Sequence, residues 1–198
     1  MAAAVSNAHT KLIHVLRSAC SGELAAGHAY RGHWKSVLSE PTRERIRAIE
    51  AEEWHHRTIV RSLLADLGSG PSAGRETVFW LIGKTIGILC HIGGWFIPMY
   101  GAGRLESWNI AEYEHAAALA REAGYIQMID CLVTMAEVEW EHERFFREQT
   151  ARHWMLRIFH AWQPPPPKAT IRLPYPEIQT PASRRASEGV HWAAGIQK

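Results

Sequence analysis

The chain has 198 residues, enough for one full domain and too few for two comfortable ones. Hydrophobic residues make up 46% and charged residues 21%, which excludes a chain disordered throughout, a collagen and a coiled-coil rod. A formal charge of +2 gives no electrostatic support for a nucleic-acid partner. The acids divide into 18 Glu and only 2 Asp, a ratio that favours helix. Three cysteines far apart form neither a disulfide framework nor a CxxC motif, so a reducing compartment is the default expectation.

Prolines and glycines divide the chain into predicted helices. Residues 7–38 carry apolar side chains at helical spacing, and residues 41–67 form a second such segment. The strongly apolar stretch 76–100 follows, and then predicted helices over about 104–122 and 125–161. No segment alternates with period two, so no strands are expected. The pattern predicts an all-α fold: a four-helix bundle over residues 7–161 with a long apolar crossover, residues 76–103, between its second and third helices. The proline-rich remainder, residues 162–198, is expected to be an extended, mostly disordered tail.

Glutamates interrupt the apolar seam of every predicted bundle helix. Each of the four seams contains one glutamate near its middle or start, and in two of them a histidine follows three residues later. These six residues are Glu23, Glu53, His56, Glu106, Glu139 and His142. A bare carboxylate in a bundle core costs several kcal/mol, and four together would repel one another. Two divalent cations would cancel four negative charges, and a Glu and a His three residues apart share one helix face. This is the ligand set of ferritin-like di-iron and di-manganese proteins.

The repetition of the pattern distinguishes it from chance. The chain contains five Glu-x-x-His strings, where about one is expected, and three of them fit a solvated face or the tail: Glu52/His55, Glu112/His115 and Glu188/His191. The glutamate-to-glutamate interval is 30 residues in the first predicted hairpin and 33 in the second. A tyrosine follows the first glutamate of each hairpin by seven residues, as Tyr30 and Tyr113. Helix phase alone favours Glu53/His56 over Glu52/His55, so that choice stays open.

Residues 12–150 resemble the demethoxyubiquinone hydroxylases, which are ferritin-like di-iron monooxygenases of ubiquinone biosynthesis. The resemblance lies in Ser21-Gly22-Glu23, the Glu53/His56 pair, the row from Glu106 to Tyr113 and the Glu139-Trp-Glu-His142 string. It implies a ferritin-like bundle, two iron ions (with manganese as the alternative), O₂, an electron donor and a polyprenyl quinol that is hydroxylated on its ring. The sequence departs from the family at Ser107, where a second glutamate is usual, and in its proline-rich tail, which replaces a further apolar helix.

The resemblance also implies a role for each residue of the pattern. Carried over position by position, it gives Glu23 and His56 as terminal ligands of one iron, Glu106 and His142 as terminal ligands of the other, Glu53 and Glu139 as bridges, and Tyr30 and Tyr113 just behind the ligands. All six ligands are thereby the expected catalytic centre.

The apolar run 77–100 is long enough to span a bilayer. A single span, however, would place Glu53 and Glu106 on opposite sides of the membrane, so the metal-site prediction excludes it. Gly83 and Gly87 would allow close helix packing. Three placements stay open: a helix that dips into one leaflet, burial in the subunit interface of a homo-oligomer, and packing within the monomer core. Since no signal or transit peptide is seen, we expect a peripheral protein on the cytoplasmic side of a membrane.

Two rival hypotheses share only part of this interpretation. The same metals could serve a ferroxidase, a peroxidase or a hydroxylase of another apolar substrate, although the absence of paired CxxC motifs disfavours a rubrerythrin-like peroxidase. Alternatively, the protein is a non-enzymatic, membrane-associated helical scaffold that uses the apolar run and the tail as docking segments. Metal content separates the scaffold from the enzymes, because a scaffold has no need of two ions.

Overall fold

The computed structural model describes the backbone of residues 2–178 and the side chains of residues 5–178. Its long helices are α1 (Ala2–Ser36), α2 (Glu40–Asp66), α3 (Ala73–Leu89), α4 (Phe96–Glu122) and α5 (Ile126–Thr150). A short helix, α6 (Leu156–Phe159), and two 3₁₀ turns, η1 (Lys168–Thr170) and η2 (Pro176–Ile178), follow. This part of the chain contains no strand, which confirms the predicted all-α class.

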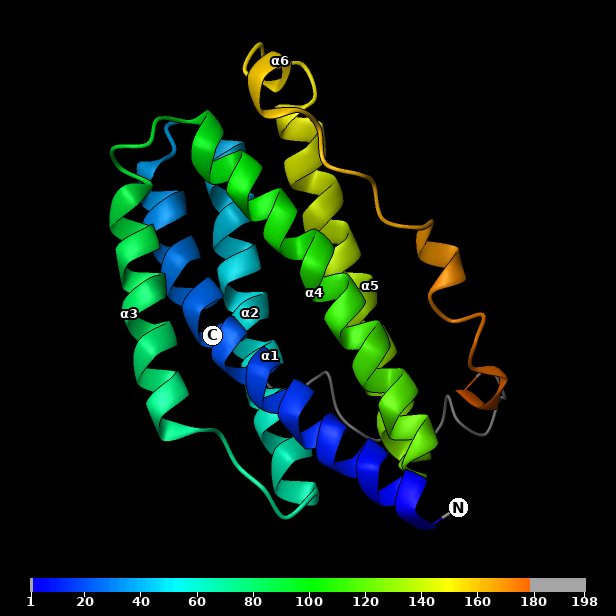
Figure 1. Ribbon diagram of the computed structural model, residues 1–198. Coiled ribbons are helices and arrows are strands. Elements are labelled where there is room, and N and C mark those ends of the chain that lie inside the picture. The colour runs from blue at the N-terminus through cyan, green and yellow to red at the C-terminus, as the bar shows by residue number, and fades with distance from the viewer. Residues whose placement is uncertain (1, 179–198) are drawn as a thin grey trace, which may run out of the picture.

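Four of these helices, α1, α2, α4 and α5, form a bundle (Figure 1). Helix α1 packs on α2 and α4 packs on α5, while α1 also contacts α4 and α2 contacts α5. Pro41 lies in the first turn of α2, where a missing backbone N–H leaves no hydrogen bond broken. Gly124 has a φ of 84°, a conformation that glycine adopts readily, and it allows the tight turn from α4 into α5. Short turns therefore make each pair a hairpin, as the sequence predicted.

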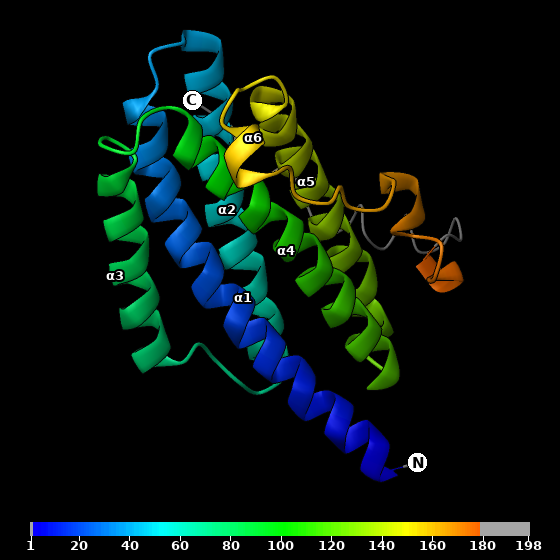
Figure 2. The same ribbon diagram turned by 45° about the horizontal axis from the view of Figure 1, so that its top comes forward.

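Helix α3 lies outside this bundle, beside α1 (Figures 1 and 2). Gly83 and Gly87 are its buried residues, and a Cβ atom on Gly83 would overlap the backbone of Ala25. The two glycines thus bring the helix backbones into contact, as their spacing predicted. Most other side chains of α3 are exposed, so this part of the apolar run is not buried within the monomer core, whereas Met99, near the end of the run, belongs to the core. No helix of the described part is both long enough and apolar enough to cross a membrane.

Two predicted boundaries of the later helices are wrong. Helix α4 begins at Phe96 instead of residue 104, because Pro98 falls in its first turn, where proline is tolerated. Helix α5 ends at Thr150 instead of residue 161. The chain then turns back onto α4, where the Tyr100 hydroxyl donates to the carbonyl oxygens of Phe159 (3.0 Å) and His160 (3.1 Å). These tertiary hydrogen bonds replace a continued helix.

Residues 162–178 pack against the bundle, in contrast to the unpacked tail expected from their prolines. Three of their apolar side chains are buried against the core: Ile171, Tyr175 and Ile178. Arg172 forms ion pairs with Asp130 (2.6 Å) and Glu137 (2.7 Å) of α5. The rest of the predicted tail, residues 179–198, lies outside the described residues.

The bundle interior contains two apolar clusters. The first includes Leu12, Leu16, Val60, Ile110 and Leu132. The second includes Ala26, Ile46, Ile49, Met99 and Phe146. On every bundle helix, residues of one cluster lie a turn or so before, and residues of the other a turn or so after, the glutamate of the seam. The predicted ligands therefore occupy a polar layer between two apolar ones.

Candidate metal centre

The structure brings all six predicted ligands together in this polar layer. They are Glu23 on α1, Glu53 and His56 on α2, Glu106 on α4, and Glu139 and His142 on α5. None is more than 3% exposed. Helix periodicity accounts for the placement, because each residue continues the apolar seam of its own helix and so faces the bundle axis.

These residues form two overlapping groups. The first group is Glu23, Glu53, His56 and Glu139, and the second is Glu53, Glu106, Glu139 and His142. In each group, one potential ligand atom per residue lies within 4.8 Å of all the others. Glu53 and Glu139 belong to both groups, so two ions held there would share two carboxylates.

Both histidines present the same ring nitrogen to the carboxylates. His56 Nδ1 lies 2.8 Å from Glu139 Oε1. His142 Nδ1 lies 3.2 Å from Glu139 Oε2 and 3.2 Å from Glu53 Oε1. The two imidazole centroids are 6.3 Å apart. Glu139 thus lies between the two histidines, in the position of a bridge.

Two tyrosines cross between the hairpins to reach the terminal glutamates. Tyr30 of α1 donates a hydrogen bond to Glu106 of α4, and Tyr113 of α4 donates one to Glu23 of α1. This reciprocity matches the repeated seven-residue interval in the sequence. Asn109 adds a second hydrogen bond to Glu106, with 2.9 Å between Nδ2 and Oε2. Sequence reasoning missed Asn109, although its position three residues after Glu106 on the same helix face could have indicated it.

Glu52, the alternative ligand, does not belong to either group; it contacts His142 on the side of the ring that faces away from the cluster. His142 Nε2 lies 2.6 Å from Glu52 Oε2, and the same oxygen accepts a hydrogen bond from Arg45 at 3.1 Å. A ligand histidine whose far nitrogen is held by a carboxylate has its ring orientation fixed. His55 is exposed, so the pair that faces the centre is Glu53 with His56.

The other Glu-x-x-His strings take no part in the centre. Glu112 is half-buried against Ser18 of α1, and His115 is exposed. The Glu188/His191 string lies outside the described residues.

Burial and mutual repulsion perturb the protonation of the cluster. Burial, together with the charges of Glu53 and Glu139, raises the pKa of Glu23 well above its ordinary value. Burial and the Glu139 charge raise the pKa of Glu106 in the same way. Burial alone would raise the pKa of Glu139 too, but hydrogen bonds from the two histidines lower it. Four carboxylates therefore cannot all be charged here without a compensating cation.

Several carboxylate oxygens of the cluster have no hydrogen-bond partner. They are Oε2 of Glu23 and both side-chain oxygens of Glu53, because His142 Nδ1, although 3.2 Å from Glu53 Oε1, does not meet it in hydrogen-bond geometry. Buried polar atoms almost always have partners, so three unpartnered oxygens in one cluster fit atoms that bind metal. The donor set, carboxylate oxygen with imidazole nitrogen, suits iron or manganese. The six residues therefore fit a site for metal ions.

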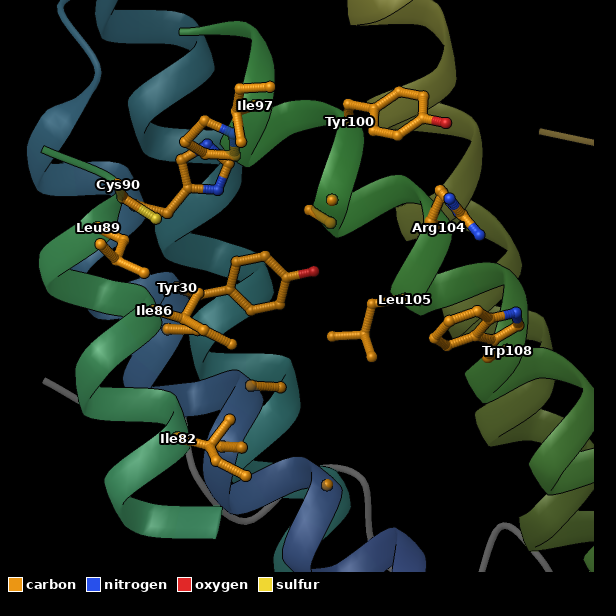
Figure 3. Close-up of a pocket in the computed structure, with 18 of the residues that line it drawn as sticks. Tyr30, Ile82, Ile86, Leu89, Cys90, Ile97, Tyr100, Arg104, Leu105 and Trp108 are labelled. Carbon is orange, nitrogen blue, oxygen red and sulfur yellow. The ribbon is translucent and has the colours of Figure 1, made fainter. Parts of the chain in front are cut away.

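An apolar cavity of about 570 Å³ adjoins the centre between α1, α3 and α4 (Figure 3). Its walls carry mainly aliphatic and aromatic side chains, including Ala26, Tyr30, Ile86, Leu89, Leu105 and Trp108. Tyr30 lies between the two walls, with its hydroxyl directed toward α4, where it donates to Glu106. One side chain therefore links the cavity to a predicted metal ligand.

Comparison of the chain with protein-family models, with curated proteins and with solved structures gives no match. The resemblance described above therefore rests on the ligand pattern alone. What the protein does has to be argued from the centre and the cavity.

Proposed function

We propose that the protein is a ferritin-like di-iron oxygenase that hydroxylates the ring of a quinol with an apolar tail, of the demethoxyubiquinone type. One observation carries the proposal. A buried Glu/His centre with two shared carboxylates adjoins an apolar cavity, and Tyr30 belongs to both.

When bound, two iron ions supply the reductive activation of O₂ by an external electron donor. In the overall reaction, one oxygen atom enters a ring C–H bond, and the other leaves as water after two electrons and two protons are added. The chain supplies the setting for this chemistry. Glu53 and Glu139 would serve both ions, because each belongs to both groups of residues. Tyr30 and Tyr113 orient the terminal glutamates by hydrogen bonds, and the two apolar clusters exclude bulk water.

The cavity favours a hydroxylase over a ferroxidase. A ferroxidase has to admit hydrated iron, which calls for a polar or acidic entrance, whereas this cavity is lined almost entirely by apolar atoms. A planar ring with an isoprenoid tail matches both the chemistry and the volume of such a cavity.

The outer face of α3 supports peripheral contact with a membrane. Its exposed apolar side chains include Val78, Leu81, Ile82, Ile86, Ile88 and Leu89. Ile82, Ile86 and Leu89 also line the cavity, so the exposed face and the cavity are continuous. In our proposal this face dips into one leaflet, and the quinol enters the cavity from the bilayer.

Metal analysis and an oxygen-dependent assay test the proposal together. We expect purified protein to hold two iron ions per chain and to add one oxygen atom, from ¹⁸O₂, to a short-tailed demethoxyubiquinol analogue. The matched variant is Ala29→Trp, which fills the cavity without touching a ligand. It should retain both ions and lose the hydroxylation. A protein without metal would contradict the proposal, as would undiminished turnover in the Ala29→Trp variant.

A further inference from the structure

His33 is a buried polar side chain in the wall of the apolar cavity. It lies on α1, is 3% exposed and lines the cavity beside Tyr30. Its Nε2 atom is buried and has no hydrogen-bond partner within the described part of the chain. A buried donor or acceptor without a partner costs about 1–3 kcal/mol. Such an atom, on a side chain that lines a cavity, points to a ligand that supplies a partner for the imidazole.

The surroundings of His33 hold the ring in place but leave this nitrogen free. The imidazole is nearly parallel to the ring of Tyr30 (centroids 6.3 Å apart, 18°) and to that of Phe146 (5.9 Å, 15°). Burial lowers the pKa of His33 to about 4, so the imidazole is neutral at physiological pH. A neutral imidazole offers one N–H donor and one acceptor nitrogen. It can therefore bind an oxygen-bearing ligand without introducing a charge into the cavity.

The tyrosine hydroxyls of the same walls already have partners. Tyr30 donates to Glu106, and Tyr100 donates to the carbonyl oxygens of Phe159 and His160. These hydroxyls are thereby committed to the metal centre and to the fold. The imidazole of His33, by contrast, can engage a ligand without breaking an existing hydrogen bond. Arg104 and Trp108 also line the cavity, but both side chains are largely exposed.

We propose that the imidazole of His33 is the polar anchor for the head group of the ligand, with one of its ring nitrogens forming a hydrogen bond with a ring oxygen of an oxygen-bearing aromatic molecule. The inference rests on the proposed function for the assignment of the cavity to the substrate, and it adds the atom that recognises the ring. His33 follows Tyr30 by three residues, about one helical turn (~4.5 Å) along α1. A ring held by His33 therefore lies against Tyr30, beside the ligand Glu106, while its apolar tail extends along Ile86 and Leu89 toward the surface.

The test compares two probes that differ only in ring chemistry. One is a hexyl-tailed demethoxyubiquinone analogue, and the other is hexylbenzene, which has no ring oxygens. Calorimetric titration of the full-length protein should show His33→Phe weakening the quinone about tenfold and leaving hexylbenzene within about twofold. His33→Gln keeps an amide that can hydrogen-bond, so it should retain part of the preference for the quinone.

The melting temperature of the ligand-free variant distinguishes a binding role of His33 from a structural one. Phenylalanine keeps the ring stacking and removes the unpartnered nitrogen, so the ligand-free His33→Phe variant should melt at the same temperature as the wild type or higher. The control is Cys90→Ala, because Cys90 also lines the cavity and its loss should change the affinities for both probes alike.

Three results would overturn the inference: equal losses for both probes in His33→Phe, no loss for either, or a markedly lower melting temperature. Failure of the proposed function is distinguishable, because it would appear as missing iron or missing hydroxylation. A His33-dependent quinone preference in such a protein would still support the anchor.

Discussion

The candidate metal centre has two halves that are built alike and surrounded differently. The first half contains the terminal residues Glu23 and His56, and the second contains Glu106 and His142. Both terminal glutamates accept a hydrogen bond from a tyrosine of the other hairpin. The second half has further support: Asn109 donates to Glu106, and Glu52 holds the far nitrogen of His142. At the position on α5 that corresponds to Glu52 stands Val138, which has no polar side-chain atom.

This difference gives the two halves distinct environments. Through Tyr30, the second half adjoins the apolar cavity, and through Glu52, whose side chain is 41% exposed, it reaches the surface. Among the described residues, the side-chain hydrogen bonds of the first half go to the buried residues Tyr113 and Glu139, and Oε2 of Glu23 lacks a partner. The repeated hairpin thus supplies a symmetric set of candidate ligands, and residues outside the repeat determine which half adjoins the cavity.

The largest expected effect comes from removing a residue that both halves share. Glu139→Ala should abolish metal binding in both, because Glu139 lies against both histidines and belongs to both ligand groups. Elemental analysis of the purified variant measures this directly. Glu112→Ala is the control and should keep two ions per chain. Retention of two ions by Glu139→Ala would refute the ligand assignment.

Removing one terminal glutamate should affect one half. Glu23→Ala and Glu106→Ala are each expected to lower the metal content from two ions to about one, since each variant leaves the other group of four residues complete. Only Glu106→Ala also removes the acceptor of Tyr30 at the cavity. Elemental analysis combined with optical spectra of the two variants compares the halves. Loss of both ions in both variants would mean that the halves do not bind independently.

The pH dependence of the metal-free protein reports the repulsion between the carboxylates. The raised pKa values of Glu23 and Glu106 mean that the folded chain binds protons more tightly than the unfolded chain, so the free energy of unfolding falls as pH rises above 4.5. Burial alone would lower the pKa of His142, but hydrogen bonds to Glu139 and Glu52 raise it well above 6.5, which extends the same trend. The lowered pKa of Glu139 affects stability only below 4.5.

Thermal melting between pH 5 and 8 measures this trend. We expect the melting temperature of metal-free protein to fall with rising pH, and that of metal-loaded protein to hold or rise, because the ions require deprotonated ligands. A metal-free protein that becomes more stable toward pH 8 would contradict the described electrostatics.

The smallest effect should come from removing the contact of Glu52 with His142, which has no counterpart in the first half. Glu52→Gln replaces the carboxylate acceptor of His142, and we expect about a tenfold loss of affinity for one of the two ions. Competition with a chelator can measure both affinities. Glu44→Gln, a change in an exposed α2 residue that pairs with Arg47, should leave both affinities unchanged. Equal weakening of both ions would show that Glu52 does not act on one half alone.

The clustering of the six residues was predictable because buried charge has few physical explanations. Helix periodicity determines which residues share a face, and a carboxylate on an apolar face calls for a cation or a partner. The same argument selected Glu53 over Glu52, and in the structure Glu53 is fully buried whereas Glu52 reaches the surface. The repeat between the hairpins added the expectation of a two-fold arrangement, which the crossed tyrosines display.

Other features were not predictable, because they depend on how two packed segments are positioned relative to each other along their axes. Nothing near Glu52 in the sequence indicates that His142 lies within hydrogen-bond distance of it. The end of α5 is set by Tyr100, some fifty residues earlier in the chain, whose hydroxyl binds Phe159 and His160. In the proline-rich segment, Ile171 and Tyr175 are too sparse to give a periodic signal, although both pack on the core.

The contact of α3 with α1 through Gly83 and Gly87 has a consequence for how the protein could be modified. Helix α3 contributes no metal ligand, yet Ile82, Ile86 and Leu89 form one wall of the cavity. The two glycines, the ion pair of Glu76 with Arg57 and the hydrogen bond from Arg75 to Ser18 hold this helix in place. The apolar side chains of α3 that line the cavity are not part of these contacts, so they can vary. Engineers could therefore reshape the cavity for longer or bulkier molecules on α3 while the Glu/His cluster of the bundle stays as it is.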